Sequence, residues 1–164
     1  MSRLNERGKL VLEMEAVQQR WFRNVYKDGQ CTGFQIAYRS TYYRGISLSL
    51  SKGFRVLVDG EQFPREAIAV IYEGETYTQD ELAKAGHVQW NLDEPVFLNI
   101  AKPGGLKLGV HEVTVNWSHR ISYIGTMPGV PEQTPPAEVG GPGPTGGTQE
   151  FGGGNCTRKL VLVR

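Results

Sequence analysis

One stretch of strict alternation constrains the fold of this chain more than any other feature. Apolar side chains and one histidine occupy every second position at Val113, Val115, Trp117, His119 and Ile121, and polar or charged side chains lie between them. A period of two places these two sets on opposite faces of a β-strand, one packed on a core and the other facing water. The stretch therefore predicts an antiparallel sheet with one buried face.

Shorter runs rich in β-branched and aromatic residues recur between turn signals along the chain. The predicted strands cover residues 21–26, 33–38, 46–50, 54–58, 68–72, 96–100 and 160–163. Asp28-Gly29 and Asp59-Gly60 predict hairpin turns, because glycine adopts positive φ without steric cost and aspartate can bond its own backbone. We therefore expect an all-β fold, an antiparallel β-sandwich formed by residues 21–164.

Two segments before and within this domain favour helix. Thr78 followed by Glu81 forms a capping box, which predicts one short helix over residues 78–85. Residues 1–20 combine helix formers with a β-favouring run, so we expect a weakly helical or irregular N-terminal arm. The same stretch lacks a long apolar run, which argues against a secretory signal or a membrane span and favours the cytoplasm.

Residues 125–155 differ in composition from the rest of the chain. Ten of the 21 glycines and six of the nine prolines fall in this window. Such a segment buries too little apolar surface to offset its ordering entropy, yet a strand-like segment follows it, so we interpret it as a loop insertion within one domain. Two interpretations stay open, which are disorder in isolation and ordering against a partner.

Composition and charge exclude several classes of protein. The 164 residues, 39% hydrophobic and 21% charged, are typical of one globular domain. A net charge of +1 without a Lys/Arg run gives no electrostatic reason to expect a nucleic acid or an anionic membrane as partner. Cys31 and Cys156 are predicted to be free thiols, because a domain of this size in a reducing compartment needs no disulfide.

No motif in the chain predicts catalysis by this chain alone. The histidines, His87, His111 and His119, lack the spacing that brings two imidazoles onto one metal, and no Cys/His set has structural zinc spacing. Neither a G-x-S-x-G motif nor a phosphate-binding glycine loop occurs. We therefore predict no catalytic residue and no metal ligand on this chain.

Two short clusters are candidate contact sites. Tyr42, Tyr43 and Arg44 are residue types enriched at interface hot spots and at sugar-stacking surfaces. On a strand the two tyrosines would point to opposite faces, so the alternative is one core tyrosine beside a surface ion pair. The second cluster is Lys102, Pro103, Gly104 and Gly105. Its proline and glycines also explain a sharp turn without any ligand.

Several motifs also occur in a recognisable order. They are Gly33-Phe34, Tyr42-Tyr43-Arg44-Gly45, Val58-Asp59-Gly60-Glu61, Lys102-Pro103-Gly104-Gly105-Leu106, Ile121-Ser122-Tyr123 and Lys159-Leu160. Together they resemble the small β subunit of bacterial C-glycoside deglycosidases, over most of the chain from about Trp21 to Val163. Residues 1–20 and the insertion depart from the pattern of that family.

The resemblance implies a non-catalytic β-sandwich subunit of a hetero-oligomeric enzyme. Such an enzyme cleaves the carbon–carbon bond between the sugar and the aromatic aglycone, for example a flavonoid, of a 3-keto C-glycoside. The partner is implied to be a TIM-barrel α subunit that holds the acid and base residues and a divalent metal, expected to be Mn²⁺. A metal beside a 3-keto sugar can stabilise an enolate and so promote departure of the aryl group.

On this basis both clusters are expected at the subunit interface or the rim of the substrate pocket. The insertion is expected to cover the pocket through Met127, Pro128, Val130 and Phe151. The alternative is a free-standing carbohydrate-binding β-sandwich that uses exposed aromatic side chains such as Tyr42 and Trp90. The two hypotheses predict different binding partners. An enzyme subunit binds a co-expressed barrel protein, whereas a carbohydrate-binding module binds glycans by itself.

Overall fold

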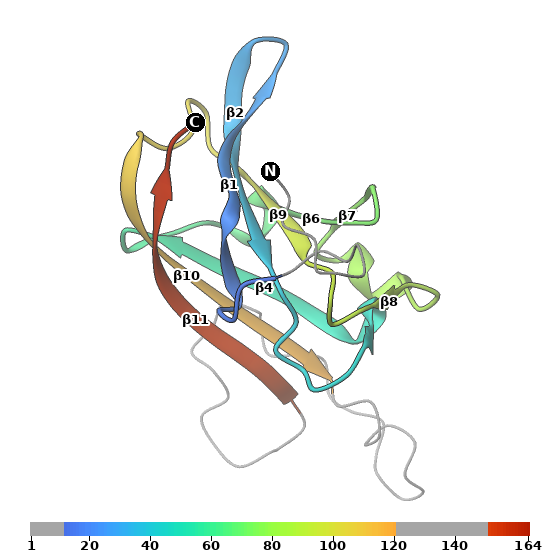
Figure 1. Ribbon diagram of the computed structural model, residues 1–164. Helices are drawn as coiled ribbons and strands as arrows, with labels where there is room; N and C mark the ends of the chain where they lie inside the picture. Colours follow the sequence, from blue (N-terminus) through green and yellow to red (C-terminus); the bar gives the residue numbers. More distant parts are fainter. Residues whose placement is uncertain (1–11, 121–150) are drawn as a thin grey trace, which may run out of the picture.

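The computed structural model describes residues 12–120 and 151–164, and in them two antiparallel sheets form a sandwich (Figure 1). One sheet contains, in spatial order, β1 (Val17–Lys27), β2 (Gln30–Tyr38), β9 (Val96–Ala101), β6 (Ile68–Tyr72) and β7 (Glu75–Thr78). The other contains β11 (Phe151–Leu162), β10 (Gly109–Arg120), β4 (Ser51–Val58) and β5 (Glu61–Gln62). A small third sheet pairs β3 (Ile46–Ser47) with β8 (Gln89–Trp90). The predicted all-β sandwich is confirmed.

The core lies between the inner faces of the two larger sheets. Val113, Val115 and Trp117 on β10 are buried, as the alternation predicts, and the residues between them are half-buried or exposed. Tyr38 on β2 packs against them, with its ring centroid 6.3 Å from that of Trp117 and 5.6 Å from that of Phe54 on β4. Because burial of each large apolar side chain contributes about 1.5–3 kcal/mol, this aromatic cluster holds the sheets together.

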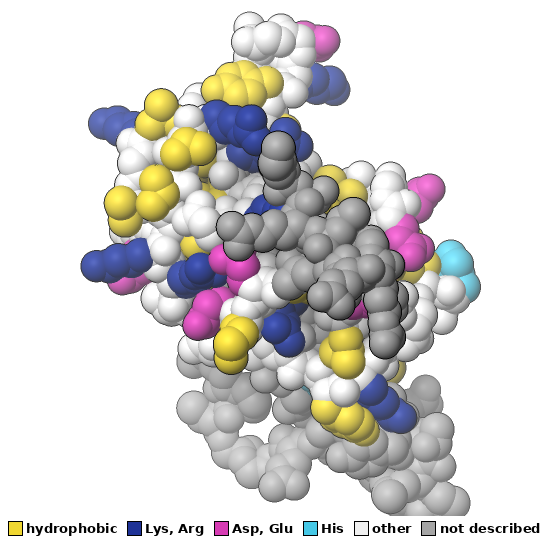
Figure 2. Space-filling model, viewed as in Figure 1, with side chains coloured by type: hydrophobic (Ala, Val, Ile, Leu, Met, Phe, Trp, Pro, Cys, Tyr) yellow, Lys and Arg dark blue, Asp and Glu magenta, His cyan; other side chains and the backbone are white. Residues whose placement is uncertain are grey.

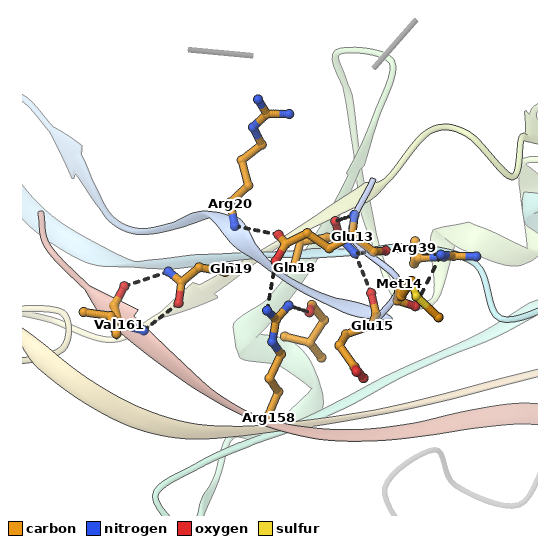
Figure 3. Close-up of polar contacts among 10 residues, drawn as sticks. Glu13, Met14, Glu15, Gln18, Gln19, Arg20, Arg39, Arg158 and Val161 are labelled. Atoms are coloured by element: carbon orange, nitrogen blue, oxygen red, sulfur yellow. Dashed lines mark hydrogen bonds and ion pairs between the residues drawn. The ribbon is translucent and has the colours of Figure 1, made fainter. Parts of the chain in front are cut away.

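The edge strands β1 and β11 meet along one side of the sandwich (Figure 3). The side-chain amide of Gln19 donates to the Val161 carbonyl oxygen at 2.9 Å and accepts from the Val161 N–H at 2.8 Å. Arg158 donates to the Val17 carbonyl oxygen at 2.9 Å and pairs with the Glu13 carboxylate at 2.9 Å. These bonds occupy backbone groups that an open sheet edge would leave unpaired.

A second glutamine joins the sheets on the other side. The amide of Gln79, which follows β7, accepts from the Phe54 N–H at 2.6 Å and donates to the Phe54 carbonyl oxygen at 3.1 Å. The neighbouring Gly53 adopts φ +126°, and a Cβ there would lie 2.2 Å from the Gln79 Oε1 atom. Glycine at this position therefore makes room for the buried amide.

Two local predictions are corrected by the structure. The predicted helix over residues 78–85 is only a 3₁₀ turn, η3 (Glu81–Lys84), although Thr78 and Glu81 do form the reciprocal capping bonds, at 2.8 and 3.3 Å. The turn contains only four residues before Ala85 leaves helical geometry, which is too short for an α-helix. The strand predicted over residues 46–50 ends at Ser47, and the chain continues as η1 (Leu48–Leu50), which is closed by a bond from the Ser51 N–H to the Leu48 carbonyl oxygen. Another 3₁₀ turn, η2 (Arg65–Ala67), lies between β5 and β6.

The bounds of the arm and of the insertion also differ from the expected ones. Strand β1 begins at Val17, inside the range 1–20 assigned to the arm, and residues 1–11 lie outside the described part. Strand β11 begins at Phe151, so residues 151–155 of the range 125–155 belong to a strand. Met127, Pro128 and Val130 lie outside the described residues. None of the helices in residues 12–120 and 151–164 is long and apolar enough to cross a membrane.

Candidate functional site

The first candidate cluster lies in the loop that leads from β2 to β3, and not on a strand. The rings of Tyr42 and Tyr43 contact each other, with centroids 4.5 Å apart, and the Arg44 guanidinium carbon lies 5.4 Å from the Tyr43 ring centroid. The two tyrosines do not point to opposite faces, as they would on a strand, because the backbone bends here. Tyr43 is 69% exposed and Tyr42 is half-buried. We call Tyr42, Tyr43 and Arg44 the tyrosine loop.

The tyrosine loop is supported by aromatic side chains at the end of β10. The ring of Tyr42 meets His119 edge-on at 4.9 Å, and His119 lies 4.5 Å from Trp117. The Trp117 indole N–H donates to the Ser51 hydroxyl at 2.8 Å, which fixes the orientation of the indole. These ring contacts form a packed base for Tyr42, which in turn contacts the exposed Tyr43.

His119 is a core histidine in the structure, as the sequence favours. It is 3% exposed, and its Nδ1 atom lies 3.0 Å from the Arg120 carbonyl oxygen. A carbonyl oxygen only accepts, so Nδ1 carries the proton. Burial lowers the pKa of His119, which keeps the imidazole neutral near pH 7 and leaves Nε2 as an acceptor.

The last residues of β10 and the first half of β11 lie beside the tyrosine loop. In the register of this pair Arg120 lies opposite Phe151, and His119 lies opposite Gly152. A Cβ at Gly154 would lie 2.5 Å from the Thr41 Oγ1 atom and 2.7 Å from the Tyr38 Oη atom. The backbone of β11 therefore fits closely against the residue that precedes the tyrosine loop.

The second candidate cluster is a tight turn after β9. Lys102 Nζ lies 3.3 Å from the Glu61 carboxylate and 5.6 Å from the centroid of the Phe63 ring. Gly105 adopts φ +66°, and a Cβ there would lie 2.5 Å from both Asn24 Oδ1 and Cys31 Sγ. Conformation and packing thus account for this Lys-Pro-Gly-Gly sequence, which supports the interpretation that needs no ligand.

The two clusters lie at opposite ends of β2. The turn after β9 bonds to the start of β2, since the Lys102 N–H donates to the Thr32 carbonyl oxygen at 3.0 Å. The tyrosine loop follows the other end of this strand, at Tyr38. Tyr38 lies six positions after Thr32 along β2, a distance of roughly 20 Å at about 3.3 Å per residue. The structure therefore does not combine the clusters into one site.

The described residues offer no site for a metal ion. Within residues 12–120 and 151–164, no three His, Cys, Asp or Glu side chains gather closely enough to bind one. Both cysteines, Cys31 and Cys156, are free thiols, as predicted. The aromatic support of Tyr42 by His119 was missed from the sequence, although the alternation already places His119 beside Trp117 on the buried face.

Comparison with known proteins agrees with the resemblance seen in the sequence. The sequence profile of the C-glycoside deglycosidase beta subunit matches residues 12–123, a range that contains the tyrosine loop and the turn after β9. The C-glycoside deglycosidase beta subunit of Eubacterium cellulosolvens is 32% identical to this chain over 114 residues, which are 69% of this chain and 78% of that protein. This chain therefore belongs to the C-glycoside deglycosidase beta subunit family.

Proposed function

We propose that this chain is the non-catalytic subunit of a heteromeric C-glycoside deglycosidase and completes a pocket whose reactive groups lie on a larger partner. Membership of the family supports a role as one subunit of such an enzyme, and a beta subunit implies a partner subunit. The observation that carries the proposal is the exposed Tyr43 with Arg44 beside it. Tyr43 contacts Tyr42, whose ring packs against His119 near the end of β10.

The proposed substrate is a 3-keto C-glycoside with an aromatic aglycone, such as a flavonoid. The enzyme would break the carbon–carbon bond between sugar and aglycone. A flat tyrosine ring with a guanidinium over it suits contact with an aromatic ring, because stacking and cation–π attraction both favour that geometry. We propose that the tyrosine loop forms one side of the pocket rim and orients the aglycone.

The partner is proposed to be a TIM-barrel subunit that supplies the divalent metal, expected to be Mn²⁺, and the acid and base. This chain would bind and orient the substrate and would exclude water from the pocket. Its insertion, including Met127, Pro128, Val130 and Phe151, is proposed to cover the pocket. The cytoplasmic location expected from the sequence stays a prediction.

The carbohydrate-binding alternative has less support. It requires exposed aromatic side chains such as Tyr42 and Trp90, but Trp90 is fully buried and its indole N–H donates to the Glu94 carbonyl oxygen at 2.8 Å. Trp90 therefore belongs to the core and offers no surface to a sugar. Of the aromatic side chains around the tyrosine loop, Tyr43 remains the exposed one.

Co-expression with the partner subunit tests the proposal. We expect the purified complex, but not this chain alone, to turn over a 3-keto C-glycoside. Tyr43→Ala should lower kcat/KM by about tenfold or more. Tyr26→Ala is the matched control, because Tyr26 is also exposed, at 61%, but lies in the hairpin at the other end of β2. Turnover by the isolated chain, or equal effects of the two variants, would contradict the proposal.

A further inference from the structure

A group of four exposed aliphatic side chains lies at one end of the four-stranded sheet, and two of them belong to its outer face. Leu108, Val110, Val161 and Val163 are 66%, 64%, 45% and 71% exposed. Val110 lies directly opposite Val161 in the register, and Leu108 and Val163 lie just before β10 and just after β11. Figure 2 shows hydrophobic side chains gathered over the start of β10 and the end of β11, upper left in the view, with Lys and Arg side chains around them. We call these four residues the aliphatic patch.

The patch departs from the pattern of its own strands. Further along β10 the outward positions hold Glu112, Thr114, Asn116 and Ser118, and further along β11 they hold Lys159, Thr157 and Asn155. On both strands the outward side chains thus change from polar to aliphatic at the same end of the sheet, where β10 begins and β11 ends. An outer sheet face that meets only water keeps polar residues there, so a local aliphatic group marks a contact surface.

The backbone beneath the patch is fixed by hydrogen bonds from β1 and from a buried side chain of β10. Gln19 bonds both backbone groups of Val161, and His111 Nε2 lies 2.6 Å from the carbonyl oxygen of Lys107, next to Leu108. The backbone N–H of Asn24 on β1 donates to the Arg164 carbonyl oxygen at 2.9 Å. A surface held in this way loses little conformational entropy on binding, which favours its use in a stable interface.

The charges around the patch indicate what binds to it. Three exposed cations, Lys107, Lys159 and Arg164, lie next to patch residues in the sequence or in the register. Two exposed carboxylates, Glu112 and Asp59, lie on the same side, and Asp59 is paired with His111. A second copy of this chain related by a two-fold axis would bring the same cations face to face, which is unfavourable. A partner with an apolar centre and carboxylates around it is complementary to the patch.

We propose that the aliphatic patch is a docking surface for the larger subunit of the enzyme, through an aliphatic surface rimmed by Asp and Glu. This inference rests on the proposed function. The patch lies about nine residues along β10 from His119, roughly 30 Å from the tyrosine loop. It therefore acts in assembly, and the tyrosine loop acts at the pocket.

Two variants with matched controls test the proposal in the co-expressed complex. Val110→Ser/Val161→Ser removes the centre of the patch, and Met14→Ser is its control because Met14 is 93% exposed elsewhere. Lys159→Glu reverses a flanking charge, and Lys84→Glu in η3 is its control. We expect each patch variant to weaken binding of the partner about tenfold or more, by calorimetric titration, with the controls unchanged. Raising the concentration of a patch variant should restore kcat, because more complex then forms. Raising the concentration of the Tyr43→Ala variant should not restore the activity.

Other results overturn the inference. If the wild-type chain binds the partner and the patch variants bind it equally well, the patch is not the docking surface and the proposed function still stands. If the wild-type chain self-associates through the patch without the partner, the patch binds a second copy of this chain and not the larger subunit. If the wild-type chain does not bind the partner at all, the proposed function fails and the inference fails with it. Equal thermal unfolding of the variants and the wild type shows that their fold is intact.

Discussion

The His111 imidazole and the Asp59 carboxylate form a close pair, with Nδ1 2.6 Å from Oδ2. The other ring nitrogen lies 2.6 Å from the Lys107 carbonyl oxygen, so both nitrogens face acceptors. Two acceptors require two N–H donors, and only the protonated ring has both. Burial alone would lower the pKa of His111, but the bonds to Lys107 and Asp59 outweigh it and raise that pKa. The bond from His111 in turn lowers the pKa of Asp59.

This pair predicts a defined dependence of stability on pH. Because the folded-state pKa of His111 is raised above 6.5, its contribution is fully present below pH 6.5 and is lost as the pH rises through the folded-state value. The pKa of Asp59 is lowered below 3.8, so its contribution is present above pH 3.8 and is lost on acidification. Urea unfolding between about pH 4 and pH 9 should show the loss on the alkaline side, and Asp59→Asn should flatten it.

The control is His87→Asn, since His87 is exposed. It should leave the shape of the pH profile unchanged. A wild-type profile that gains stability as the pH rises from about 6 to 9 would contradict the assignment of a protonated His111.

The two glutamines that join the sheets predict unequal losses of stability. Gln79 is 4% exposed, so Gln79→Ala leaves the Phe54 N–H and carbonyl groups buried and unpaired and should cost about 2–4 kcal/mol. Gln19→Ala makes the same deletion at a half-buried site where water can replace the amide, and it should cost about 1 kcal/mol or less. Chemical denaturation measures both. Equal losses would show that the burial of Gln79 has no consequence.

The close approach of β11 to Thr41 predicts that Gly154 tolerates no side chain. The Cβ of Gly154→Ala would meet Thr41 Oγ1 and Tyr38 Oη, at 2.5 and 2.7 Å, and relief of this overlap should cost about 1–3 kcal/mol. Gly86→Ala is the control, because the nearest atom to its Cβ lies 3.8 Å away. Adding Tyr38→Phe to Gly154→Ala removes one of the two clashing atoms. It should recover part of the loss, as a double-mutant cycle in unfolding experiments measures.

The long strands and the core were predictable because their signal is local. Alternation alone identifies the inner face of β10, and it also places Val110 on the outer face, so part of the aliphatic patch could have been found from the sequence. Strands of two residues, such as β5 and β8, carry no periodic signal. The contact between Tyr42 and Tyr43 depends on a bend that no turn motif announces. The pairing of Gln79 with Phe54 joins positions 25 residues apart, and only the packed sheets determine it.

The register of β10 with β11 allows the proposed role of the insertion to be tested separately from its effect on the fold. Because Arg120 lies opposite Phe151, a two-residue Asn-Gly turn in place of residues 122–149 would connect the two strands directly. The unfolding temperature of this variant should stay near that of the wild type, since the β10–β11 pairing is retained. If the insertion covers the pocket, kcat/KM of the complex should fall about tenfold or more, because water then reaches the substrate.

A replacement of residues 122–149 by a Gly/Ser segment of the same length identifies which property of the insertion matters. It keeps the reach of the chain but removes Met127, Pro128 and Val130, so activity should stay low if these side chains contact the substrate or the partner. Recovery of kcat/KM with the Gly/Ser segment would assign the effect to chain length alone. Unchanged kcat/KM in the Asn-Gly variant would show that the pocket needs no cover from this chain, and it would leave the tyrosine loop as the proposed contribution of this subunit to the site.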